Sequence, residues 1–75
     1  MSETVIDARG HRCPVPTLRL ARALERAAPG ARLRLLADDP LARIDVPHFA
    51  AGKDCTIISC EAEGSALAFV VQKGS

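Results

Sequence analysis

The sequence has few aromatic residues. Among its 75 residues there is no tryptophan or tyrosine, and Phe49 and Phe69 are its two phenylalanines. Apolar residues nevertheless make up 48% of the chain. A hydrophobic core must therefore be filled mainly by Leu, Val, Ile and Ala. A chain this short has too few apolar residues for two separate cores. We therefore expect one domain over residues 1–75, and we favour a monomer.

Long apolar runs are also missing. No stretch of about 18 apolar residues is present that could span a bilayer. The first ten residues, MSETVIDARG, have neither the basic start nor the apolar segment of a secretory signal. We therefore expect a cytoplasmic protein that does not insert into a membrane.

The chain has three cysteines and no CxxC or HxxxH pair. Cys55 and Cys60 are five residues apart in one predicted strand, which would place them on opposite faces and roughly 16 Å apart. A disulfide requires Cα atoms within about 7 Å, so we expect reduced thiols. Among the histidines and cysteines, His11 and Cys13 are the pair of potential zinc ligands that are close in sequence, and His48 lies far from them. We expect no metal and no cofactor, and we assign Cys55 and Cys60 structural roles, one in the core and one exposed.

The net charge of +1 is unevenly distributed along the chain. Residues 9–26 contain five arginines and one glutamate, a net charge of +4. No glycine-rich phosphate loop or aromatic platform accompanies them, so direct nucleic-acid binding is disfavoured. A solvated helix face is one interpretation of these arginines. We prefer a docking surface for a protein partner, formed by Arg9, Arg12, Arg19, Arg22 and Arg26.

Hydrophobic periodicity and turn residues predict the element order β-α-β-α-β-β. The strands are expected at 4–7, 31–37, 55–63 and 66–73, and the helices at 14–28 and 41–51. This order predicts an α+β fold, a two-layer sandwich with two helices on one face of a four-stranded mixed sheet.

The sequence also predicts which side of the first helix faces the core and how the second helix begins. In the first, Leu18, Ala21, Leu24 and Ala28 lie on one side and are expected to face the core. In the second, Asp39 can act as the cap and Pro40 can occupy the first turn. Pro47 is expected to kink this helix or to split it into two short pieces.

Cys13 directly precedes the first predicted helix. A helix start presents unpaired N–H groups and the positive end of the helix dipole, and nearby arginines add positive charge, so a thiolate there is stabilised. Pro14 and Pro16 make the first turn rigid and leave the N–H groups of Val15 and Thr17 available to the sulfur. We interpret Cys13 as an exposed, activated thiol, the alternative being a simple cap or a small buried apolar residue.

Hydrolysis by this cysteine is disfavoured by its surroundings in the sequence. A nucleophilic hydrolase needs a base and a group that orients the base. His11 and His48 have no evident orienting partner, and a domain this small offers little room for a substrate cleft. The residues around Cys13 therefore do not favour a hydrolase.

The stretch around Cys13 resembles the signature of the TusA/SirA-like sulfur-carrier family. The pattern D-x-x-G-x-x-C-P-x-P is present as Asp7, Gly10, Cys13, Pro14 and Pro16. The segments ADDP at 37–40 and DVPHF at 45–49 are similar to family segments at matching places. The resemblance covers essentially the whole chain.

This resemblance implies a sulfur relay. Cys13 would accept sulfane sulfur as a persulfide from a donor protein, namely a cysteine desulfurase, a rhodanese or a DsrE-like protein, and pass it to an acceptor protein. Asp7, Gly10, Pro14 and Pro16 would position the cysteine. The uses implied are tRNA thiolation, molybdenum-cofactor synthesis or sulfur oxidation, and such a protein belongs to the sulfurtransferase class without a substrate cleft of its own. The alternative is a regulatory or interaction module in which Cys13 senses oxidants.

Overall fold

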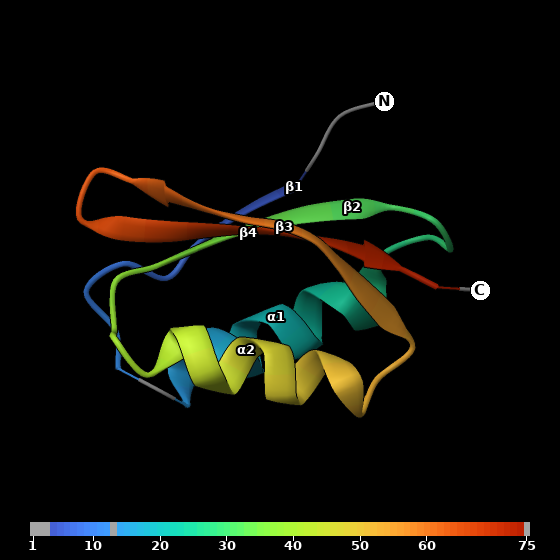
Figure 1. Ribbon diagram of the computed structural model, residues 1–75. Helices are drawn as coiled ribbons and strands as arrows, with labels where there is room; N and C mark the ends of the chain where they lie inside the picture. The colour runs from blue at the N-terminus through green and yellow to red at the C-terminus, as the bar shows by residue number, and fades with distance from the viewer. Residues whose placement is uncertain (1–3, 13, 75) are drawn as a thin grey trace.

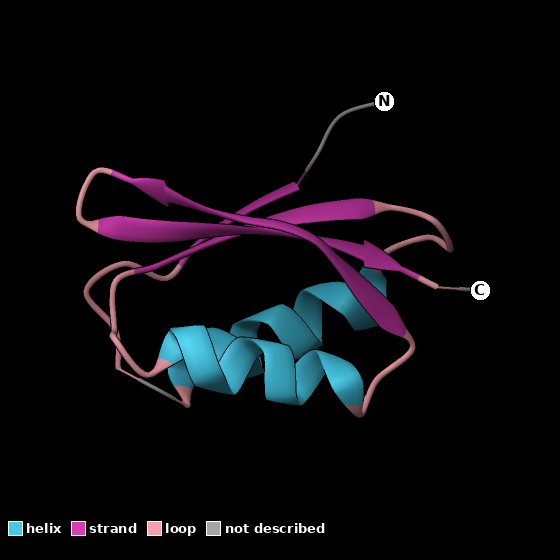
Figure 2. Cartoon of the chain, viewed as in Figure 1, coloured by secondary structure: helices cyan, strands magenta, loops and turns pink. Residues whose placement is uncertain are grey.

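A four-stranded sheet forms one layer of the molecule and two helices form the other (Figures 1 and 2). The computed structural model describes residues 4–12 and 14–74. The elements, in chain order, are β1 (Thr4–Asp7), α1 (Val15–Arg26), β2 (Arg32–Ala37), α2 (Ala42–Ala51), β3 (Cys55–Glu63) and β4 (Ala66–Lys73). The predicted α+β class and β-α-β-α-β-β order are confirmed.

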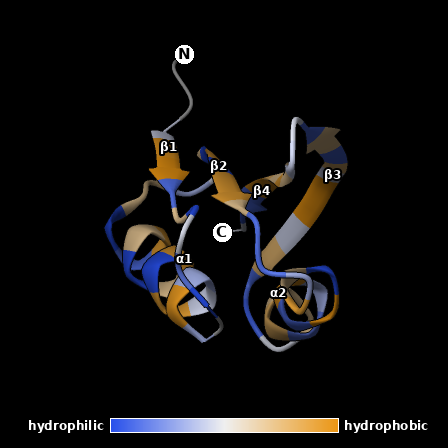
Figure 3. Ribbon diagram, turned by 90° about the vertical axis from the view of Figure 1, so that its left-hand side faces the viewer, coloured by the Kyte–Doolittle hydropathy of each residue, from blue (hydrophilic) through white to orange (hydrophobic). Residues whose placement is uncertain are grey.

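The sheet is mixed, with the strand order β1-β2-β4-β3. β1 and β2 are parallel, and β4 pairs antiparallel with both β2 and β3. Both helices lie on the same face of the sheet, side by side (Figure 3). Because β1 and β2 are parallel and adjacent, α1 is the crossover between them, so the loop that leads from β1 into α1 lies at one end of the sheet.

The core lies between the sheet and the helices. Leu33 and Leu35 of β2 are 2% and 0% exposed, which confirms the predicted alternation with Arg32 and Arg34. The other large buried side chains of this core are Leu20, Val46, Phe69 and Val71. Each buried aliphatic side chain contributes about 1.5–3 kcal/mol relative to an exposed one.

The prediction of which side of α1 faces the core was wrong for its first residue. Leu18 is 59% exposed, whereas Leu20 is fully buried and packs with Leu24. Ala28 lies beyond the end of the helix and is exposed. Apolar residues occur on two sides of α1, and periodicity alone could not say which side the sheet covers.

The start and middle of α2 also differ from expectation. Asp39 lies ahead of the helix, where its carboxylate accepts the N–H of Leu41 over 3.0 Å, and α2 itself begins at Ala42. Pro47 lies inside α2, which runs unbroken from Ala42 to Ala51, so the predicted split was wrong. Pro47 lies on the exposed side of α2, while Val46 packs into the core.

A β-bulge corrects the predicted placement of the two later cysteines. The pairing of β3 with β4 shifts between Ile57 and Ser59. As a result Cys55 lies opposite Lys73 and Cys60 lies opposite Phe69, and these two β4 residues share a face because they are four apart. Both cysteines therefore lie on the helix-covered side of the sheet, not on opposite faces.

Within residues 4–12 and 14–74, neither helix is long and apolar enough to cross a membrane.

Replacing Leu20 by Ala should reduce the free energy of unfolding by about 2–5 kcal/mol, because it leaves a cavity under α1. The matched control Leu18→Ala should change it by about 0.5 kcal/mol or less, because Leu18 faces solvent. Urea unfolding followed by circular dichroism measures both values. Equal losses in the two variants would contradict the orientation of α1.

Candidate functional site: the loop between β1 and α1

Two loops meet at one end of the molecule, the one between β1 and α1 and the one between β2 and α2 (Figure 1). The N–H of Gly10 donates to the two carboxylate oxygens of Asp38 over 3.0 and 3.1 Å. Gly10 has φ +84°, a backbone conformation that favours glycine. The N–H of Ala8 donates to the carbonyl of Leu36 over 2.8 Å and continues the β1–β2 pairing into the loop.

Asp7, at the end of β1, is paired with Arg9. The Arg9 guanidinium donates to both carboxylate oxygens over 2.9 and 2.8 Å, and the Arg9 N–H donates to one of them over 3.1 Å. The side-chain and backbone hydrogen bonds from Arg9 hold the pKa of Asp7 well below its usual range. The same contact raises the pKa of Arg9. Both groups are exposed, so the pair shapes the loop more than it stabilises the fold.

Cys13 lies outside the described residues, so its predicted exposure and role are not addressed by the structure. On either side of it, the N–H of Val15 donates to the carbonyl of Arg12 over 2.9 Å. The predicted availability of the Val15 N–H to the sulfur is therefore wrong, because a tight turn uses that group. The Pro14 carbonyl accepts hydrogen bonds from the Leu18 N–H and the Thr17 hydroxyl over 3.0 and 2.8 Å.

The two prolines of the motif have different environments. Pro14 is exposed and caps the N-terminus of α1, whereas Pro16 is fully buried among the core residues. The first turn of α1 therefore has a buried residue at Pro16 and an exposed one at Pro14. The rigidity of the helix start stays a prediction from the fixed φ angles of the two prolines.

The five predicted docking arginines divide into two groups. Arg9 is bound to Asp7, and Arg19 donates to the Asp7 carbonyl over 2.8 Å. These two arginines brace the end of β1. The other three, Arg12, Arg22 and Arg26, have exposed side chains. A shallow groove runs along α1 beside them, with Val15, Leu18, Arg19, Ala21, Arg22 and Glu25 as its lining.

A recess of about 430 Å³ lies between the two meeting loops. Gly10, His11 and Arg12 form one wall, and the segment from Asp38 to Pro40 forms the other. Its charged groups are those of Arg12, Asp38 and Asp39, so it is polar and carries both signs of charge. Asp38 is the residue that the sequence analysis missed. The segment ADDP was noted as a family feature, but nothing in the sequence indicated that its first aspartate reaches Gly10.

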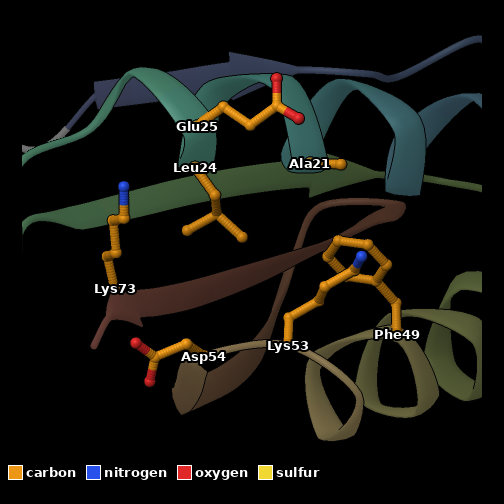
Figure 4. Close-up of a pocket in the computed structure, with 7 residues that line it drawn as sticks. All are labelled: Ala21, Leu24, Glu25, Phe49, Lys53, Asp54 and Lys73. Carbon is orange, nitrogen blue, oxygen red and sulfur yellow. The ribbon is translucent and has the colours of Figure 1, made fainter. Parts of the chain in front are cut away.

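A second groove, of about 210 Å³, lies toward the opposite ends of the helices (Figure 4). Leu24 and Phe49 provide its apolar lining, and Lys53 lies 5.6 Å from the Phe49 ring centre. Lys73, on its edge, donates to the Ala27 carbonyl over 2.8 Å. The side chains that line this groove are thus engaged in contacts within the molecule.

The two histidines considered as a base or as metal ligands lie on different elements. His11 is exposed in the β1–α1 loop and His48 is exposed on α2. Among the residues that the structure describes, no three His, Cys, Asp or Glu side chains are arranged to hold a metal ion.

The two later cysteines differ in environment. Cys55 is half-buried against the core, with its Sγ 3.9 Å from the Ala50 carbonyl oxygen. Burial, and to a lesser extent the negative charge of Asp54, raises the pKa of the Cys55 thiol. Cys60 is exposed. This division agrees with the expectation that one cysteine belongs to the core and the other does not.

The fold and the site together define a class: a small α+β sandwich in which a braced, arginine-rich loop carries a Cys-Pro-x-Pro sequence into the first helix. The sequence matches the family described as sulfurtransferase TusA over residues 4–73, and the chain belongs to that family. Proteins of this family relay sulfur between partner proteins, and membership supports a sulfur-carrier role. The resemblance predicted from the sequence is confirmed.

The fold is also that of a SirA-like protein from Desulfitobacterium hafniense, known from a crystal structure. The two superpose with a TM-score of 0.74 and share 24% sequence identity, over 96% of this chain and 99% of the other. The two layers and the element order are thus those of a known fold.

In a Cys13→Ser variant, Cys60 should react with a disulfide reagent at least tenfold faster than Cys55 at neutral pH. Cys60 is exposed, whereas the raised pKa of Cys55 leaves less thiolate on that residue. The labelling of Cys55 should therefore require a higher pH than the labelling of a free thiol, whose pKa is about 8.5. Timed labelling followed by peptide mass mapping measures the two rates. In urea the rates should converge, and equal rates in the folded protein would contradict the assigned burial.

Proposed function

We propose that this protein is a sulfur carrier that accepts sulfane sulfur on Cys13 and hands it to an acceptor protein. The observation that carries the proposal is membership of the TusA sulfurtransferase family, with the motif cysteine at position 13. The raised pKa of Cys55 supports the choice of Cys13 over that cysteine. The exposed arginines near the loop support a partner protein over a small substrate held in a cleft.

The reaction is an exchange of sulfur between thiols and needs no cofactor. The Cys13 thiolate attacks the terminal sulfur of a persulfide on the donor. The S–S bond of the donor breaks, its thiolate leaves, and a persulfide forms on Cys13. An acceptor thiolate then attacks the terminal sulfur of that persulfide and releases Cys13. Each step forms one S–S bond and breaks another, so no external oxidant or reductant is consumed.

The braced loop provides what such a relay requires. Gly10 and Asp7 fix the path of the chain that leads to Cys13, and Pro14 and Pro16 set the start of α1 after it. The positive charge of Arg12 and the N-terminus of α1 would stabilise both the thiolate and the persulfide anion.

The partner proteins would bind along the outer side of α1. Arg22 and Arg26 supply positive charge there, and the exposed Leu18 supplies an apolar contact. A donor of the cysteine desulfurase, rhodanese or DsrE-like type would dock through an acidic surface. The sulfur would then enter tRNA thiolation, molybdenum-cofactor synthesis or sulfur oxidation in the cytoplasm, where thiols stay reduced.

Incubation with a cysteine desulfurase and cysteine, or with rhodanese and thiosulfate, should add one sulfur to the wild-type protein. Cys13→Ser should gain none, whereas Cys55→Ser and Cys60→Ser should load like the wild type. Intact mass spectrometry before and after treatment with a reductant measures the added sulfur.

Loading that survives Cys13→Ser would overturn the proposal. If every donor leaves the wild-type mass unchanged while Cys13 is open to alkylation, the oxidant-sensing alternative gains support. That alternative requires a reversible sulfenate or mixed disulfide on Cys13 without transfer to an acceptor.

The double variant Arg22→Glu/Arg26→Glu should slow loading from a donor protein by about tenfold at low salt, because charge steering is lost. Arg43→Glu, a single charge reversal on the exposed side of α2, is the control for a change of net charge away from α1. Initial rates at two salt concentrations measure the effect. Loading from inorganic polysulfide should stay unchanged in all three proteins, and a similar slowing there would show that the arginines act on the thiol and not on docking.

A further inference from the structure

The loop between β1 and α1 is held at its ends by the sheet and by its own neighbours in the chain. The Ala8 N–H bonds to β2, the Arg9 side chain bonds back to Asp7, and the Arg12 carbonyl accepts the first N–H of α1. These contacts would form whatever the loop between β2 and α2 contains. Within the loop the His11 N–H donates to the Ala8 carbonyl over 3.2 Å, and the N–H of Gly10, between these two residues, is bound from elsewhere.

The middle of the loop is held by Asp38. Its carboxylate lies across the Gly10 N–H, with both oxygens within 3.1 Å, although the two residues are 28 positions apart. This contact joins the loop between β1 and α1 to the loop between β2 and α2. Because Gly10 has φ +84° and no Cβ, its N–H can turn toward Asp38 without strain.

The negative charge of Asp38 is not expected to favour the proposed chemistry, because a carboxylate opposes the formation of a thiolate in its vicinity. The charged or titratable groups around the recess and the loop are Asp7, Arg9, His11, Arg12, Asp38 and Asp39, with Arg19 contributed by α1 and Glu63 by β3. Arg9 is paired with Asp7, and the charges of Glu63 and Asp38 also act on Arg9, so the charge of Asp38 must be separated from its hydrogen bond by experiment.

We propose that Asp38 is a positioning residue for Cys13: it holds the Gly10 N–H and thereby fixes the course of the chain that leads to Cys13. The inference rests on the proposed function in so far as Cys13 is the attacking thiol. Asp38 acts through the loop and takes no part in the sulfur exchange itself.

Two variants of Asp38 separate the hydrogen bond from the charge. Asp38→Asn removes the charge and keeps a carbonyl acceptor for Gly10, whereas Asp38→Ala removes both. Both are made in a Cys55→Ser/Cys60→Ser background, in which Cys13 is the only thiol. The pH profile of its alkylation by iodoacetamide is measured alongside the urea unfolding curve of each protein.

Asp38→Ala should be alkylated at least threefold more slowly at pH 7 than Asp38→Asn, with its midpoint shifted to higher pH, although both variants carry the same net charge. Asp38→Asn should match the wild type or exceed it. Identical profiles for the two variants would overturn the inference, as would a difference that disappears once each rate is corrected for the folded fraction.

A second route disturbs the other partner of the same hydrogen bond. Gly10→Ala places a side chain at φ +84° and should slow alkylation as Asp38→Ala does. Combining the two changes should slow alkylation little more than either change alone, because both disturb the same hydrogen bond. Fully additive effects would contradict the proposed role of Asp38. Alkylation needs no sulfur donor, so a wild-type protein that fails to load sulfur would refute the proposed function and leave this test in force.

Discussion

The packing of α1 against the sheet is the constraint on which the rest of the structure depends. Pro16, Leu20 and Leu24 are its buried residues, and Leu20 and Leu24 belong to the same core cluster as Leu35 and Phe69. Because Pro16 is itself buried, the start of α1 cannot move without exposing apolar surface. The motif sequence around position 13 leads directly into this helix start.

Polar contacts at the site end of the molecule serve the backbone of one loop. Arg9 and Arg19 bind the side chain and the carbonyl of Asp7, and Asp38 binds the N–H of Gly10. All of these groups are exposed, where ion pairs and hydrogen bonds contribute little to the free energy of folding. Their effect is on local geometry. The core stabilises the fold, and the exposed hydrogen bonds hold the loop in one conformation.

Much of the fold could be predicted from the sequence, because strong local signals agreed with one another. The β-hairpin from Cys55 to Lys73 was predicted to the residue, since its strands are rich in β-branched residues and Gly64 marks the turn. The errors arose where two local patterns competed. Leu18 and Leu20 are equally apolar, and only the position of the sheet decides which is buried. The bulge after Ile57 likewise has no marker in the sequence, so the shared face of the two later cysteines could not be foreseen.

The sequence by itself determined the family, the element order and the cysteine that the motif singles out, because these depend on residues close together in the chain. Tertiary structure decided which residues brace the loop. Asp38 and Gly10 are 28 positions apart, and they meet because the parallel pairing of β1 with β2 brings the ends of both strands to the same edge of the sheet. It also separated the two prolines into one exposed cap and one core residue, because burial depends on what packs above a residue and not on its neighbours in sequence.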